Sequence, residues 1–220
     1  MNEFPRISVN KLGEYMNATV SRRRQIIKDQ KHPSSFKAAY YAPAQDALTK
    51  YLVGEWKESD LVRRFETLVC QSAGNDYKGK VNGCSAGAID AFLGNYDELG
   101  ISGEIRRADC SVMTMDYLGV TVSVRPNLLI RDEYTSEVIG AVKFHFSKSA
   151  PLGDGGCDYV ALMMRLFLEE ELGLKNINGK MCIVLDIHDG NLRSSPKAYV
   201  NRKRDLDAAC AEIFARWETI

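Results

Sequence analysis

Residues 119–148 read GVTVSVRPNLLIRDEYTSEVIGAVKFHFSK, and their pattern points to the class of fold. Valine alternates with polar residues over 120–124, which is typical of a strand with one buried face. A short apolar run at 128–130 follows Pro126, and residues 138–146 are rich in β-branched and aromatic side chains. These three segments, separated by turn residues, predict an antiparallel meander of strands.

The segments after this meander predict a helix, a strand and a closing helix. Residues 158–172 are expected to form a long helix that ends at Gly173, since glycine commonly caps a helix C-terminus. Residues 181–187 are apolar throughout, as expected for a central or parallel strand. Residues 204–217 have an amphipathic helical pattern. This order predicts an α/β (α+β) fold with a mixed sheet flanked by helices.

The first hundred residues have the spacing of helices rather than strands. Ser8 has the side chain of an N-cap and precedes a helical apolar stripe. Residues 72–83 are rich in glycine, asparagine and lysine and predict a loop. We therefore expect a helical region at 1–100 and an α/β core at 101–220, packed together as one unit. The first helix is expected to run from Ser8 until Pro33, Ser34 and Ser35 stop it. The other helices of this region are expected at residues 43–53, 59–71 and 85–99.

The composition is that of an ordinary globular chain. Of 220 residues, 45% are hydrophobic and 26% charged, which excludes a wholly disordered protein. The 29 basic and 29 acidic residues give a formal net charge of zero. This balance argues against a generally basic nucleic-acid-coating protein and leaves room for a local basic patch. No apolar run approaches the ~20 residues that span a bilayer, and residues 1–10 contain no apolar signal core, so we expect a cytoplasmic protein.

The cysteines predict neither disulfides nor a metal site. The six of them form no CxxC pair, and no histidine follows them at zinc-finger spacing. Reduced, mostly buried thiols are the expected state.

Two segments of the meander resemble the PD-(D/E)XK nuclease superfamily, particularly its RecB-like exonuclease branch. They are GVTVSVRPNLLI at 119–130 and GAVKFHFSK at 140–148, which resemble the two hairpin strands that hold the metal site in that family. The opening ISVNKLGEY at 7–15 is similar to the S-x-x-x-L-x-x-Y start of RecB-like proteins. The resemblance covers residues 100–200 and, weakly, the first helix. It implies a restriction-endonuclease-like core, in which a helix and then a strand follow the hairpin.

The chain departs from that family at all three positions of the motif. Asn127 occupies the place of the family's Asp, Lys143 that of its Asp or Glu, and His145 that of its Lys. Hard cations such as Mg²⁺ choose oxygen ligands, for which a neutral amide is a poor sole anchor. An ammonium group at the metal's place would also repel the metal. The resemblance therefore implies a pseudonuclease, with a nuclease-like fold, no catalytic residues, no metal and no cofactor.

Basic side chains are the candidates for binding nucleic acid, because cations neutralise phosphates without any metal. Lys143, His145 and Lys148 would line the pocket at the degenerate motif, with Arg125 nearby. A second run of basic side chains, Arg22–Arg24, lies in the first helical region. The alternation over 143–147 also fits an ordinary half-exposed strand, and the second run also fits a solvated helix face. A third group, Arg202–Arg204, begins the closing helix, where cations oppose the helix dipole, and a bound ligand is one explanation. The nucleic-acid-binding candidates are Arg22, Arg23, Arg24, Arg125, Lys143, His145 and Lys148.

Three functions stay open at this point. The first is an inactive, nuclease-like subunit that binds nucleic acid or protein partners within a larger nucleic-acid-processing or antiviral defence complex, away from membranes. The second is an active nuclease whose Mg²⁺ or Mn²⁺ is held by relocated ligands. The third is a protein–protein adaptor. Cleavage of DNA or RNA would favour the second, and binding without cleavage the first. The candidate relocated ligands are Asp116, Asp132, Glu133, Glu137 and Asp186.

Overall fold

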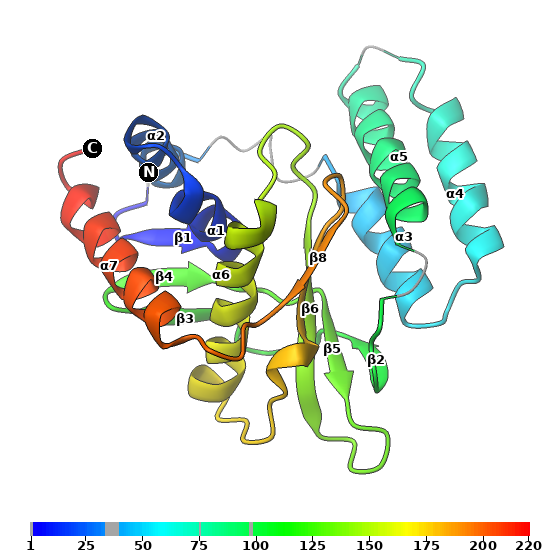
Figure 1. Cartoon of the computed structure of the whole chain (residues 1–220). Coiled ribbons are helices and arrows are strands. Elements are labelled where there is room, and N and C mark those ends of the chain that lie inside the picture. Colours follow the sequence, from blue (N-terminus) through cyan, green and yellow to red (C-terminus); the bar gives the residue numbers. More distant parts are fainter. Residues whose placement is uncertain (1, 34–39, 75, 97–98) are drawn as a thin grey trace.

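A five-stranded mixed sheet forms the centre of the molecule (Figure 1). The computed structural model describes residues 2–33, 40–74, 76–96 and 99–220. The strands lie in the order β2-β5-β6-β7-β8, with β6 and β7 parallel and the other neighbours antiparallel. The predicted class of mixed α and β structure is therefore confirmed. The strands are β2 (Glu104–Arg107), β5 (Leu128–Arg131), β6 (Val138–His145), β7 (Cys182–Asp186) and β8 (Asn191–Ser194).

The two central strands, β6 and β7, have the burial that their sequences predict. Every residue of β7 is buried, as expected for an apolar strand covered on both faces. In β6, Ala141 belongs to one hydrophobic core, whereas Val142 and Phe144 belong to the other. Gly140 lies where β6 passes the 3₁₀ turn Gly179–Met181, and a Cβ there would collide with the Met181 carbonyl. Glycine at this position therefore allows the two segments to approach closely.

A second sheet joins residues 6–8 to the middle of the chain. Its order is β1-β4-β3. β1 (Arg6–Ser8) pairs in parallel with β4 (Val120–Ser123), and β3 (Thr114–Tyr117) pairs with β4 in antiparallel fashion. The strand predicted at 120–124 exists, but it belongs to this sheet rather than to the meander. Arg125, with a left-handed φ of 44°, and Pro126 redirect the chain between β4 and β5.

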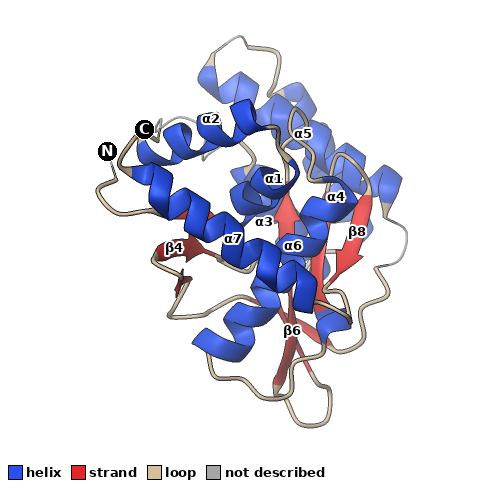
Figure 2. Cartoon of the chain, turned by 60° about the vertical axis from the view of Figure 1, so that its left-hand side comes forward, coloured by secondary structure: helices blue, strands red, loops and turns tan. Residues whose placement is uncertain are grey.

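Helices cover both faces of the five-stranded sheet, which gives three layers (Figure 1). The helices α3, α4 and α5 cover one face. Helix α6 contacts the other face and α1 packs on it, while α2 and α7 lie against the three-stranded sheet. Figure 2 brings these four helices forward. The bounds are α1 (Val9–Asn17), α2 (Val20–Lys31), α3 (Ala42–Leu52), α4 (Glu58–Cys70), α5 (Tyr77–Asn95), α6 (Gly153–Leu166, continued by the π-helical turn Phe167–Glu171) and α7 (Val200–Trp217).

The helical region differs from the prediction at two places. The single helix predicted from Ser8 to Pro33 is two helices, because Thr19 caps a new helix by accepting a hydrogen bond from the Arg22 N–H. Ser34 and Ser35 of the predicted stop lie outside the described residues. The loop predicted over 72–83 is wrong from Tyr77 onward, where α5 begins. Gly79 and Asn82 are buried in this helix, so residues that indicate a loop by composition serve close packing instead. Residue 75, within that predicted loop, and residues 97–98, near the end of the predicted helix 85–99, lie outside the described residues.

The two halves of the chain share their packing. β1 pairs with β4, and α1 crosses α6 at a point where Gly13 and Gly156 lie close together. A Cβ on Gly13 would lie 2.8 Å from the Gly156 carbonyl oxygen, so the crossing depends on the absence of a side chain there. Residues 1–100 thus contribute directly to the cores around both sheets.

Two further features of the chain are the state of its cysteines and the length and polarity of its helices. All six cysteines are free thiols, with Cys157, Cys182 and Cys210 buried and Cys70 exposed. Across the described ranges, each helix is too short or too polar to cross a membrane.

Candidate functional site

The three motif positions meet on one face of the central sheet. Alternation along β6 places Lys143 and His145 on the same face as Ala141, beneath α1 and α6. Asn127 immediately precedes β5, and its backbone N–H donates to the Val142 carbonyl at 2.9 Å. Asp186, the last residue of β7, is the register partner of His145. We call these four residues, Asn127, Lys143, His145 and Asp186, the motif cluster.

Asn127 fastens β5 to β6. Its side-chain Oδ1 accepts a hydrogen bond from the backbone N–H of Phe144 at 2.8 Å. This bond continues the ladder between the strands by one residue beyond β5. The oxygen at the position where the resemblance implies a metal ligand is therefore already used in a hydrogen bond within the sheet.

Lys143 is held against the turn between β4 and β5. Its Nζ donates to the Arg125 carbonyl oxygen at 2.6 Å. Burial, together with the positive charge of Arg125, lowers the pKa of Lys143 to about 8. Arg125 itself is exposed. The partly buried Lys143 thus has its amino group bound to the backbone of the β4–β5 turn.

His145 and Asp186 form the buried end of the motif cluster. His145 is 4% exposed, and its Nε2 lies 2.9 Å from the Ala150 carbonyl oxygen, to which it donates as the Nε2–H tautomer. Burial lowers the pKa of His145, and the Asp186 charge opposes this shift. Burial also raises the pKa of Asp186, whose Oδ2 accepts from the Leu152 N–H at 2.7 Å. The Asp186 Oδ1 has no hydrogen-bond partner among the described residues.

Helix α1 covers the motif cluster and adds Asn10 and Glu14. Asn10 donates from Nδ2 to the Phe144 carbonyl at 2.9 Å. Glu14 is buried and pairs with Lys11 and with Arg22, whose Nε lies 2.7 Å from Glu14 Oε1. Burial acts to raise the pKa of Glu14, but the hydrogen bonds from Lys11 and Arg22 outweigh it, so the pKa is lowered. The local sequence pattern gives no signal for Glu14, because the burial of this side chain depends on an arginine of the next helix.

The basic run on α2 divides into inward and outward side chains. Arg22 binds Glu14, as described above. Arg23 donates from Nε to the Tyr15 carbonyl at 3.1 Å and pairs with Glu212 of α7 at 3.4 Å. Arg24 is exposed. Two of the three arginines therefore connect helices. Lys148, the remaining basic candidate, lies just beyond β6 and is exposed.

The candidate relocated ligands come from three separate places: Asp132, Glu133 and Glu137 share the turn between β5 and β6, Asp116 lies in the turn between β3 and β4, and Asp186 ends β7. Asp116 accepts from the Gly119 N–H at 3.1 Å in the turn between β3 and β4. Asp132 accepts from the N–H groups of Tyr134 and Thr135 in the turn between β5 and β6. Glu137 accepts from Asn176 at 2.7 Å. Among the residues that the structure describes, no three His, Cys, Asp or Glu side chains gather as a metal site would require.

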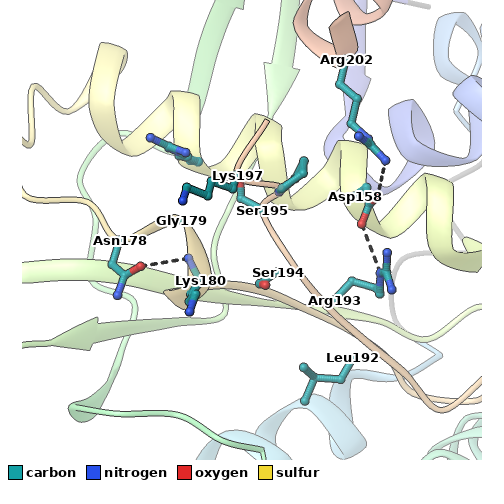
Figure 3. A pocket seen from close by; sticks show the side chains of 12 residues that line it. Asp158, Asn178, Gly179, Lys180, Leu192, Arg193, Ser194, Ser195, Lys197 and Arg202 are labelled. Atoms are coloured by element: carbon teal, nitrogen blue, oxygen red, sulfur yellow. Dashed lines mark hydrogen bonds and ion pairs between the residues drawn. The ribbon is translucent and has the colours of Figure 1, made fainter. Parts of the chain in front are cut away.

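A second polar site, which we call the basic pocket, lies at the β8 edge of the sheet. It has a volume of about 700 Å³ and opens between α6, β8 and the start of α7 (Figure 3). Sequence analysis pointed to one of its residues, Arg202, through the basic group at the start of the closing helix. The pocket is lined by Asp158, Arg165, Asn178, Gly179, Lys180, Leu192, Arg193, Ser194, Ser195, Pro196, Lys197 and Arg202.

Comparisons of the chain with known protein families, with curated proteins and with solved structures each found no match. The motif cluster and the basic pocket are therefore the features of this chain that bear on its function.

Proposed function

We propose that this chain is a nucleic-acid-binding subunit with a nuclease-like core and no nuclease chemistry, acting within a larger nucleic-acid-processing or defence assembly. The observation that carries the proposal is the meeting of Asn127, Lys143 and His145 on one sheet face. The order of β5, β6, α6 and β7 supports it too. A hairpin, a helix and then a strand parallel to the second hairpin strand follow one another as the resemblance implies.

The side chains of the motif cluster do not fit a catalytic metal ion. The Asn127 amide oxygen accepts from the Phe144 N–H, and the His145 Nε2 faces the Ala150 carbonyl. Lys143 contributes a cation where the family has a carboxylate, and like charges repel at that range. A Mg²⁺ ion would need several oxygen ligands that face one open point. We therefore derive no metal-dependent step for this site.

The exposed cations beside the motif cluster are suited to a phosphate backbone. Arg125 and Lys148 are exposed, and Lys143 on β6 donates to the Arg125 carbonyl. Contacts of this kind position a nucleic acid without reading its bases. Binding by this chain is therefore proposed to be independent of sequence and strongly dependent on salt.

Fluorescence anisotropy with labelled DNA and RNA tests this function. The double variant Arg125→Gln, Lys148→Gln should bind all sequences more weakly, with a log–log salt slope reduced by roughly 0.7 to 0.9 for each lost phosphate contact. The matched control is Lys78→Gln, Lys80→Gln, which removes two exposed charges from α5 on the other side of the sheet. This control should bind as the wild type does.

The same preparation tests for the absence of cleavage. DNA and RNA incubated with the wild-type chain and Mg²⁺ or Mn²⁺ should stay intact. Cleavage that a chelator abolishes would support the active nuclease instead. A wild-type chain that binds neither DNA nor RNA would reject the proposal in favour of the protein adaptor.

A further inference from the structure

We propose that the basic pocket binds a phosphate group, carried either by a free phosphorylated ligand or by the end of a nucleic acid strand. The basic pocket shares no residue with the motif cluster or with the exposed cations beside it. This inference therefore does not rest on the proposed function, and each can fail without the other.

The charge of the basic pocket favours an anion. Five cationic side chains line it, against the single carboxylate of Asp158. Lys180 and Lys197 are exposed at its rim, and neither forms an ion pair with any residue that the structure describes. A concave site with cations of one sign concentrates anions from solution.

Asp158 arranges two arginines at the pocket wall (Figure 3). This carboxylate is 4% exposed. It accepts from Arg193 Nε at 3.2 Å and from Arg202 Nη2 at 2.8 Å. Each guanidinium has five N–H donors, so donors remain on both for a ligand. A planar guanidinium that is already held in place suits the geometry of phosphate oxygens.

Arg165 is held in the pocket by three neighbours. It lies seven residues after Asp158, two turns along the same face of α6. Its Nε donates to Glu169 at 2.8 Å, and its Cζ lies 4.6 Å from the centre of the Tyr199 ring. A Cβ at Gly179 would lie 3.0 Å from Arg165 Nη1, so glycine there leaves room for the guanidinium.

Ser195 supplies a second and independent observation. The residue is 5% exposed and lines the pocket, yet its Oγ has no hydrogen-bond partner among the described residues. Its N–H donates to the Cys182 carbonyl at 3.0 Å, which places it on the same sheet face as Arg193. Buried hydroxyls in proteins are almost always hydrogen-bonded. A ligand oxygen in the pocket would supply the missing acceptor.

The size and lining of the pocket limit the ligand. About 700 Å³ lies within the range of small-molecule sites. The apolar lining is limited to Leu192 and Pro196 among the described residues. A phosphate monoester or diphosphate with a compact organic part fits these properties better than an apolar ligand does.

Calorimetric titration with inorganic pyrophosphate tests the proposal on the full chain. The wild type should bind it, and the exposed double variant Lys180→Gln, Lys197→Gln should bind roughly tenfold more weakly. Ser195→Ala should also lose roughly tenfold in affinity, while its free energy of unfolding does not fall, because no hydrogen bond within the protein is lost. The matched control Lys78→Gln, Lys80→Gln should bind as the wild type does.

Competition experiments identify the source of the phosphate. Displacement of pyrophosphate by a nucleoside diphosphate would indicate a free phosphorylated ligand. Displacement by a 5′-phosphorylated oligonucleotide, but not by the same oligonucleotide without the phosphate, would indicate a strand end. Absence of pyrophosphate binding at millimolar concentration, or equal binding by all variants, would overturn the inference. Either result leaves the anisotropy test of the proposed function unaffected.

Discussion

The motif cluster and the basic pocket are both polar sites beneath the layer of α1, α6 and α7, but they differ in which groups lack partners. In the motif cluster, the donors of Lys143 and His145 and the Asn127 Oδ1 are bound to backbone groups of neighbouring segments. Among the described residues, the buried acceptors without partners are Asp186 Oδ1 in the motif cluster and Asn10 Oδ1 on the helix that covers it. In the basic pocket, cations outnumber carboxylates and a serine hydroxyl has no acceptor. The contrast shows that polar residues at positions that resemble a family motif can form hydrogen bonds that hold a sheet together, whereas donors without acceptors around a cavity are available to a ligand.

The largest effect is expected at the carboxylate that organises the basic pocket. Asp158→Asn should lower the free energy of unfolding by about 2 kcal/mol, because two arginines lose their shared buried partner while keeping some solvent contact. The control Asp154→Asn removes a mostly exposed partner of Arg193 and should change stability by less than about 0.5 kcal/mol. Urea denaturation measures both. Equal effects would mean that Asp158 has no special role.

The structural role of the motif cluster can be tested at Asn127. Asn127→Leu should cost about 1 to 2 kcal/mol of unfolding free energy, because the buried Phe144 N–H loses its acceptor. Asn127→Asp keeps an acceptor at this place and should retain most of the stability. Equal stability of the two variants would mean that Asn127 does not stabilise the fold through its hydrogen bond to Phe144.

Acid should destabilise the folded chain through the buried histidine of the motif cluster. Burial lowers the pKa of His145 in the folded chain, so the unfolded chain binds more protons and stability falls as the pH drops through about 6.5. His145→Gln should therefore lose less stability between pH 7.5 and pH 5.5 than the wild type. The exposed His32→Gln variant is the control.

Asp186 acts in the opposite direction in the same titration. Burial raises its pKa in the folded chain, so its contribution to stability increases as the pH falls through that raised value. The effect of His145 is therefore taken as the difference between the variant and the wild type. A variant that parallels the wild type over the whole range would contradict a buried neutral histidine.

At pH 7, the smallest effect on stability is expected at Lys143. Its pKa of about 8 in the folded chain means that the unfolded chain binds more protons above that pH, so wild-type stability should rise between pH 7.5 and pH 9.5. Lys143→Met should lack this rise and, at pH 7, should differ from the wild type by no more than about 1 kcal/mol. Thermal denaturation across this pH range distinguishes the two.

The sequence predicts those elements whose buried positions follow from the residue pattern within a single segment. The apolar run of β7 and the alternation of β6 both correspond to observed strands. Gly79 and Asn82 misled the prediction of α5, because their packing against neighbouring segments is not encoded in their composition. The strand at 120–124 was placed in the wrong sheet, because its partner β1 lies more than a hundred residues earlier.

The candidate site was predictable only where its residues lie on adjacent strands. Asn127, Lys143 and His145 come from one hairpin, and the strands bring them together. The inward direction of Arg22 depends on Glu14 of another helix. The basic pocket collects side chains from four separate segments, so no local pattern reveals it, and Arg202 alone gave a signal.

One titration can report on both sites at once. Backbone amide NMR spectra of the isotope-labelled chain, recorded with increasing inorganic pyrophosphate and no divalent metal, follow every assigned N–H separately. We predict that the largest shifts occur at Gly179, Ser194, Ser195 and Lys197, while the signals of His145 in the motif cluster and of its neighbour Phe144 do not move. Largest shifts at Phe144 and His145, with the pocket amides unmoved, would contradict it.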